Sequence, residues 1–204
     1  MEIRERILNK TFELMSRLGV SSVTMDTIAQ QCGISKRTLY EQFTDKRTLL
    51  QTVLHRLYVQ RSVSFSRVMQ NAPNKLEAML NMYFISKDYV ATVSEVFIND
   101  IERLYPDIQQ QCREREMHYM QELARLIAEG QQEGVFRQGF KAAKAASAFT
   151  LQMRTVKGNM GHFPEGATVI EVLDTLFINF LRGIASEVGI KIIDSVLADH
   201  GINP

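Results

Sequence analysis

Apolar residues recur along the chain at helical spacing, and breaks in this pattern divide the chain into segments. At the start, Ile3, Ile7 and Leu14 follow a period near 3.6 residues, and Gly19 ends the run. A periodicity of this kind places one face of a helix against a core. The first segment is therefore predicted to be an amphipathic helix that ends at Gly19.

Three further segments follow, each opened by a hydroxyl residue. The pattern restarts after Thr24, after Ser35 and after Thr44, and the last of these segments runs to about Met69. Serine and threonine accept hydrogen bonds from the first N–H groups of a helix, so these three residues are predicted N-caps.

The rest of the chain continues as helical segments separated by glycine and proline. No strand-like alternation and no internal repeat interrupts it. The segments cover residues 74–91, 93–104, 107–133, 140–160 and 167–187, with a further short one at 191–199. The prediction is an all-α fold of about nine helices, with a small three-helix head at residues 1–48 and a larger helical body at residues 49–204.

Charge is unevenly distributed along the chain. Residues 1–70 contain 11 Lys and Arg against 6 Asp and Glu, whereas residues 71–204 contain 13 against 17. A basic amino-terminal part on an acidic body favours contact between the first part and a polyanion, although such a segment is often only a solvated face.

Residues 25–43 have the pattern of a helix-turn-helix. Ala29 is small where two helices would cross, and Gly33 stands in the turn, where a left-handed backbone costs glycine little. Leu39 and Phe43, four residues apart, share the inward face of the second helix.

Two adjacent cations, Lys36 and Arg37, begin that second helix. The positive end of a helix disfavours cations, so a structural reason alone does not explain them. A recognition helix presents its first residues to the major groove of DNA, which makes Lys36, Arg37, Thr38 and Tyr40 candidate DNA contacts. Lys46, in the first turn of the next helix, is a further candidate for a phosphate; the alternative is a set of solvated lysines.

The stretch from residue 24 to residue 50 resembles the amino-terminal domain of TetR-type transcriptional regulators. It reads TMDTIAQQCGISKRTLYEQFTDKRTLL. The resemblance is strong over about the first 50 residues, and beyond them it consists only of length and helix order. It implies DNA contacts from Thr24, Ser35, Lys36, Thr38, Tyr40 and Lys46, to which the residue pattern adds Arg37.

Two residues depart from the pattern of that family. Arg37 stands where glycine is frequent, and Glu41 stands where an aromatic residue or histidine is common. Arg37 is either an additional base contact or the partner of Glu41 in a surface pair at i,i+4 spacing.

The resemblance also implies a body that binds a small effector and dimerises through its last two long helices. Independently, residues 169–185 are apolar on two faces, which requires burial on both; a central core helix of a monomer is the alternative. The predicted dimer contacts are Val169, Leu173, Phe177, Phe180, Leu181 and Ile184.

Methionine and aromatic residues are frequent in the middle helices and can line an adaptable apolar cavity, or simply pack the core. The predicted effector pocket consists of Tyr83, Phe97, Tyr105, Met117, His118, Met120, Phe149 and Met153.

Signs of other functions are missing from the sequence. The four histidines are isolated, and no metal-ligating, phosphate-binding or nucleophile motif is present, so we expect no metal, no cofactor and no enzyme activity. No apolar run approaches the roughly 20 residues that span a bilayer, and the first residues lack a secretory signal, so we expect a cytoplasmic protein without a membrane partner.

We expect a homodimeric, ligand-responsive transcriptional regulator that binds a palindromic double-stranded DNA operator. A repressor is expected rather than an activator. One alternative is a DNA-binding architectural or protein-controlled factor without a small-molecule effector. The other, from a different class, is an all-α enzyme with an incidental basic head.

Overall fold

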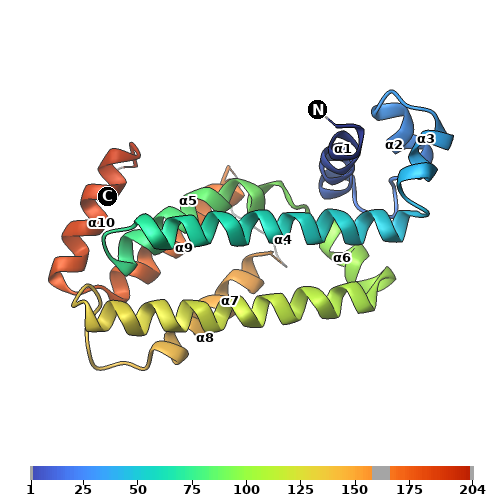
Figure 1. Cartoon of the computed structure of the whole chain (residues 1–204). Coiled ribbons are helices and arrows are strands. Elements are labelled where there is room, and N and C mark those ends of the chain that lie inside the picture. The colour runs from blue at the N-terminus through green and yellow to red at the C-terminus, as the bar shows by residue number, and fades with distance from the viewer. Residues whose placement is uncertain (1, 158–165, 203–204) are drawn as a thin grey trace. The chain divides into compact units, whose positions relative to one another are not determined.

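The computed structural model describes residues 2–157 and 166–202, apart from the side chains of residues 88–90 and 157. Its named elements are all helices, in agreement with the predicted fold class (Figure 1). They are α1 (Ile3–Leu18), α2 (Met25–Gln31), α3 (Lys36–Gln42), α4 (Lys46–Asn71), α5 (Lys75–Thr92), α6 (Glu95–Leu104), α7 (Pro106–Gln132), α8 (Ala142–Lys157), α9 (Val169–Ile184) and α10 (Glu187–Asp199). About nine helices were predicted, and the described part contains ten because the short final stretch also forms one.

The caps of the head helices were predicted correctly in two of three cases. Thr24 accepts a hydrogen bond from the Thr27 N–H at 3.1 Å. Ser35 accepts one from the Thr38 N–H at 3.0 Å.

The prediction for Thr44 is wrong. The neighbouring Asp45 carboxylate accepts the Thr48 N–H at 2.7 Å, and α4 begins one residue later, at Lys46. These N–H contacts stabilise the charged carboxylate, so the pKa of Asp45 lies below its usual value.

Contacts divide the chain into two compact units. The first unit comprises Met1–Val63 and Thr92–Gln111, and the second comprises Ser64–Ala91 and Cys112–Pro204. The first unit thus contains α1 to α3, most of α4 and all of α6. The predicted division at residue 48 stays a prediction.

In the first unit, α6 packs against α1 and the turn that follows it. The Ser94 N–H donates to the Ser16 carbonyl at 2.9 Å, and the Ser21 N–H donates to the Asp100 carboxylate at 2.7 Å. Gly19 lies between these bonds with φ +85°, and a Cβ there would stand 2.6 Å from Val96. The approach of α6 therefore requires glycine at this position for both space and backbone conformation.

In the second unit, α9 contacts both α8 and α10 (Figure 1). Its buried side carries Phe177, whose ring stacks on Tyr83 at 4.0 Å. The Tyr83 hydroxyl donates to Asp174 at 2.6 Å, and the Lys87 ammonium lies 3.3 Å from the same carboxylate. This polar group is satisfied within the unit and fixes α5 against α9.

None of the helices in the described residues has the length and apolarity needed to cross a membrane.

Candidate functional site

The helices α2 and α3 and the turn between them form a rigid frame. Gly33 has φ +62°, the left-handed conformation predicted for the turn, and the Ile34 N–H donates to the Ala29 carbonyl at 3.0 Å. Leu39 and Phe43 are fully buried, as predicted. Burial of this side of α3 leaves its opposite side in solvent.

That exposed side carries the predicted DNA-contacting residues of α3. Lys36, Arg37 and Tyr40 are exposed, and Tyr40 retains 49% of its surface. Thr38 is half-buried, and its hydroxyl lies 2.8 Å from that of Ser35. Lys36, Arg37 and Tyr40 are thus accessible at the first turns of α3, while Ser35 and Thr38 hold the start of the helix.

Both cations of this strip have carboxylate partners. The Lys36 ammonium lies 2.5 Å from Asp26, and Arg37 Nε donates to Glu41 at 3.0 Å. The Arg37 side chain is 89% exposed, and pairs of this kind contribute only a few tenths of a kcal/mol. The predicted surface pair therefore exists, and it is weak enough for a phosphate or a base to displace it.

Lys46 lies in the first turn of α4 and is half-buried. Its ammonium donates to the Ser21 carbonyl at 3.5 Å. Partial burial lowers the pKa of Lys46, although the charge of Asp100 opposes this shift. Lys46 thus also links α4 to the α1–α2 turn, and its phosphate contact stays a prediction.

Two residues that the sequence analysis did not select join helices of the first unit. Asp100 is 4% exposed and shares the inward side of α6 with Phe97 and Ile101. Burial raises the pKa of its carboxyl, but hydrogen bonds from Ser21 and Arg103 outweigh this effect and hold the pKa below its usual value. The sequence does contain a signal for Asp100, because its carboxylate stands at an apolar position of an amphipathic helix.

Arg47 is the second such residue. Its guanidinium forms an ion pair with Asp107 at the start of α7 and lies 5.8 Å from the Tyr105 ring. The hydrogen bond from Arg47 holds the pKa of Asp107 below its usual value.

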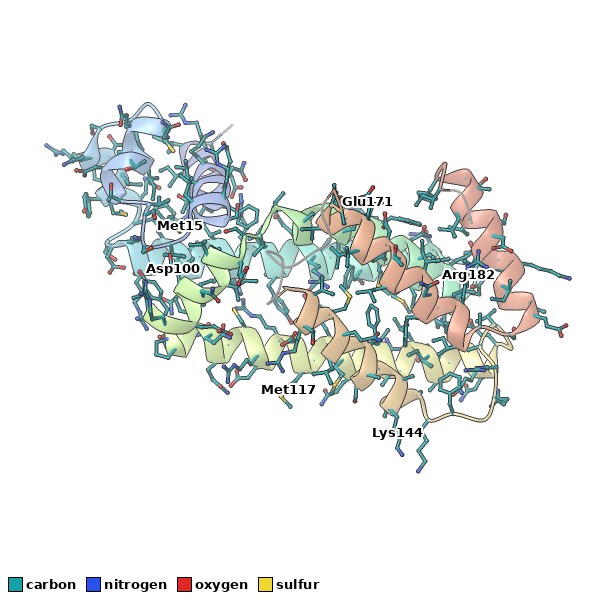
Figure 2. All side chains as sticks on the ribbon, turned by 180° about the vertical axis from the view of Figure 1, so that it is seen from behind. Met15, Asp100, Met117, Lys144, Glu171 and Arg182 are labelled. Atoms are coloured by element: carbon teal, nitrogen blue, oxygen red, sulfur yellow. The ribbon has the colours of Figure 1, made fainter. Side chains whose placement is uncertain are left out.

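The residues predicted for the effector pocket are distributed over both units. Phe97 and Tyr105 belong to the first unit, and the remaining six belong to the second. Met117 is 58% exposed and projects from α7, and His118 is also exposed (Figure 2). Tyr83 and Phe149 do come together, since both rings contact Phe177, while Met120 accepts a weak hydrogen bond from Ser147. Met153 is half-buried on α8.

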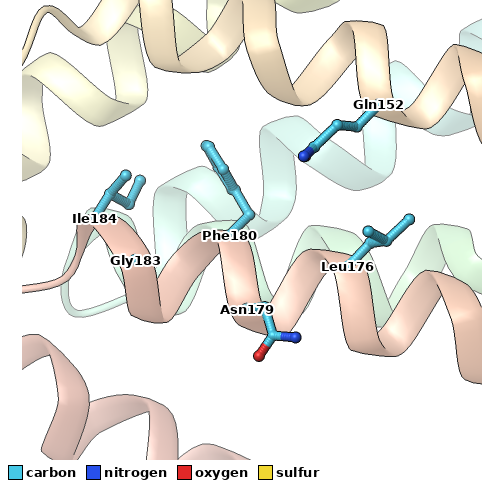
Figure 3. Close-up of a pocket in the computed structure, with 6 residues that line it drawn as sticks. All are labelled: Gln152, Leu176, Asn179, Phe180, Gly183 and Ile184. Carbon is cyan, nitrogen blue, oxygen red and sulfur yellow. The ribbon is translucent and has the colours of Figure 1, made fainter.

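A hollow of about 310 Å³ lies instead between α8 and α9, as Figure 3 shows. Gln152 of α8 and Phe180 of α9 both point into the space between the two helices, while the Asn179 side chain points away from α8. The lining is Gln152, Leu176, Asn179, Phe180, Gly183 and Ile184. None of the eight predicted pocket residues lines it.

The residues predicted for the dimer contact lie mostly on the inward side of α9. Leu173, Phe177, Leu181 and Ile184 are each less than 10% exposed against the other helices of the second unit. Val169 and Phe180 are half-buried. The burial of the first four is a physical reason to move the predicted contact to the exposed side of α9, which carries Leu176, Asn179 and Gly183; the dimer itself stays a prediction.

Comparison with known proteins identifies the head. Residues 7–53 match the family model described as bacterial regulatory proteins, tetR family, and these residues contain α2, the turn, α3 and the start of α4. The chain has the amino-terminal domain of the TetR family. Residues 24–50, which carry the resemblance in the sequence, lie inside the matched segment.

Curated relatives match in this TetR-family domain. The HTH-type transcriptional regulator UidR of Escherichia coli strain K12 is 41% identical over 51 residues, 25% of this chain and 26% of that protein. The regulator SrpR of Pseudomonas putida is 38% identical over 53 residues, 26% of this chain and 25% of that protein. The match spans about a quarter of the length of these relatives.

Solved structures extend the likeness in fold to the helical body. A TetR-family transcriptional regulator from Agrobacterium tumefaciens has a TM-score of 0.74 at 18% identity, covering 90% of this chain and 98% of that chain. A putative regulator from Saccharomonospora viridis, solved in complex with choline, has a TM-score of 0.68 at 19% identity, covering 90% and 98%. At these identities the likeness shows a shared helical fold with a helix-turn-helix head.

Proposed function

We propose that this chain is a homodimeric transcriptional regulator that binds a palindromic DNA operator and is released from it by a small molecule, as a repressor. The observation that carries the proposal is the exposed basic start of α3, held in a capped helix-turn-helix whose sequence matches the TetR family.

Contacts to DNA divide by chemistry. Lys36 and Lys46 present ammonium groups, which act on phosphates as point charges without selecting a base. Arg37 presents a planar guanidinium, which can donate two hydrogen bonds to the O6 and N7 atoms of a guanine. Arg37 is therefore the residue to which we assign sequence preference, and it exchanges its weak pair with Glu41 for the base.

The dimer is assigned to the exposed side of α9, where Gly183 supports it. A Cβ built on Gly183 would meet no atom within 4 Å, so packing within the described chain does not require glycine there. Glycine inside a helix costs about 1 kcal/mol relative to alanine. Close approach of a second copy at Gly183, beside Leu176 and Asn179, gives this glycine a role.

The effector site is assigned to the helical body, and its ligand is left open. Support comes from the Saccharomonospora viridis relative, which was solved with choline. A second candidate function, DNA binding without a small-molecule effector, is favoured by the distribution of the predicted pocket residues over two units.

The decisive experiment selects bound sequences from random double-stranded DNA with the purified full chain. The proposal predicts enrichment of an inverted repeat, with half-sites one helical turn or a multiple of it apart. Arg37→Ala should relax one base position in each half-site, whereas Lys191→Ala, a change at an exposed lysine of α10, should leave the recovered motif unchanged. Failure to enrich any motif would contradict the proposed function.

A further inference from the structure

A second hollow, of about 530 Å³, lies at the turn between α7 and α8. We call it the basic hollow, and the residues that define it here are Arg137, Phe140, Lys141, Lys144, Phe180 and Ile184. Its volume lies within the range of about 300–1,000 Å³ that is typical of small-molecule sites. All of these residues belong to the second unit.

Three cations surround the basic hollow without an acidic partner. Arg137, Lys141 and Lys144 are exposed, and among the described residues no ion pair joins any of them to a carboxylate. Lys144 extends from the first turn of α8 into solvent (Figure 2). Residues 71–204 contain more acidic than basic residues, so the positive charge of these three side chains is opposite in sign to the net charge of that part of the chain.

The other wall of the basic hollow is apolar. Phe140 and Phe180 are half-buried aromatic residues, and Ile184 closes the wall between them and the core. The Arg137 guanidinium lies over the Phe140 ring, 5.9 Å from its centroid, which places one cation against the aromatic surface. Cations and aromatic rings at one concave surface suit a ligand with an anionic head and an apolar body.

We propose that the basic hollow binds a small organic anion in which a carboxylate is attached to a flat or extended apolar body. The carboxylate contacts Lys141 and Lys144, and the apolar part lies against Phe140 and Phe180. The site contains none of the residues predicted for the effector pocket, and the inference does not depend on DNA binding. It shares Phe180 and Ile184 with the predicted dimer contact, so a ligand in the basic hollow excludes these two residues from that contact.

Calorimetric titration of the full chain with 2-naphthoate tests the proposal directly. The neutral 2-naphthamide serves as a ligand of the same shape without the charge. We expect saturable binding of 2-naphthoate, at least tenfold weaker binding of the amide, and a loss of about tenfold in the Lys141→Gln/Lys144→Gln double variant. Lys191→Gln, which removes an exposed lysine of α10, should bind 2-naphthoate as the natural chain does.

Each contrary result overturns the site. Absence of 2-naphthoate binding does so directly. Equal binding of the acid and the amide would show apolar adsorption only. An unchanged affinity of the double variant would exclude Lys141 and Lys144 as ligand contacts. Sedimentation of the double variant tests the other occupant: a dimer that dissociates when these lysines are replaced would make the basic hollow a contact between two copies. Far-ultraviolet circular dichroism confirms that each variant retains its helices.

Discussion

At the scale of single residues, the proposed sequence preference depends on Arg37. In the DNA-free chain its guanidinium is held by Glu41 at 3.0 Å, and both side chains are exposed. A base contact must therefore replace an interaction that contributes only a few tenths of a kcal/mol. Such a weak pair orients the guanidinium without preventing its transfer to DNA.

Replacement of Arg37 by alanine should cost about 1–3 kcal/mol of binding free energy per half-site on the selected operator. The reason is the loss of two hydrogen bonds to one guanine, and fluorescence anisotropy on operator and random DNA measures it. Glu41→Gln is the matched control, since it breaks the surface pair and leaves the cation. Equal losses on operator and random DNA would instead make Arg37 a phosphate contact.

Gly19 lies where α6 approaches the end of α1, and a Cβ there would stand 2.6 Å from Val96. Gly19→Ala should destabilise the chain by more than 1 kcal/mol, because it adds a crowded methyl group to a backbone with φ +85°. Gly134→Ala is the matched control: its φ is +78°, but a Cβ there would meet nothing within 4 Å. Urea unfolding compares the two, and equal losses would show that crowding at Gly19 has no effect.

Asp100 ties α6 to the α1–α2 turn, and its contribution should depend on pH. Because its folded pKa is lowered, the stabilisation is present above the unfolded value of about 3.9 and is lost as pH falls through the folded pKa. Asp100→Asn should therefore lower the free energy of unfolding by about 1–3 kcal/mol at pH 7.

The difference between the natural chain and Asp100→Asn should shrink as the pH falls below about 4. Urea titrations at pH 7 and at progressively lower pH measure it, with Asp199→Asn at the exposed end of α10 as the control. A difference independent of pH would assign the effect to packing rather than to the carboxylate charge.

At the scale of single helices, α9 has two adjacent residues with different environments, one in the core and one at the hollow. Phe177 is 5% exposed and stacks on Tyr83, whereas Leu176 lines the hollow on the other side. Consecutive residues of a helix point about 100° apart, so a charge at each position has a different consequence.

Phe177→Glu should destabilise the second unit by several kcal/mol, because it buries an unpaired carboxylate in the core. Leu176→Glu should leave a helical chain that sediments as a monomer and binds the operator more weakly. Circular dichroism and sedimentation separate the two outcomes. A stable dimer of Leu176→Glu would exclude this side of α9 as the contact.

At the scale of the whole molecule, the proposed release from DNA requires linkage between the binding of the effector and the binding of the operator. To weaken operator binding 100-fold, an effector must favour the non-binding form by ~2.7 kcal/mol, and DNA must weaken effector binding by the same factor. Helix α4 begins with Lys46 in the first unit and continues past Val63 into the second, so it is a continuous element present in both.

Reciprocal titration should therefore show about 100-fold lower effector affinity for the operator-bound chain than for the DNA-free chain. Isothermal calorimetry with and without saturating operator measures both arms. An effector that binds the two forms equally would rule out release by this route and favour the candidate without a small-molecule effector.

Much of the head followed from the sequence because its determinants are local. The caps at Thr24 and Ser35, the left-handed Gly33 and the buried pair Leu39 and Phe43 depend on residues three or four positions apart. Thr44 was predicted as the cap of α4, but Asp45 occupies that position. Such rules identify a helix start to within one residue, because neighbouring polar side chains compete for the same N–H groups.

The tertiary structure alone determined the contacts between segments that are distant in the sequence. Asp100 meets Ser21 across 79 residues of sequence, and Arg137, Lys141 and Lys144 meet Phe180 only because α8 packs against α9. The sequence predicted two apolar faces on α9. The periodicity of apolar residues is the same for a face buried in the core of one chain and for a face that contacts a second copy. The packing of α5, α8 and α10 around α9 determines that Leu173, Phe177 and Leu181 belong to the core, because burial depends on the neighbours of a helix and not on its own sequence.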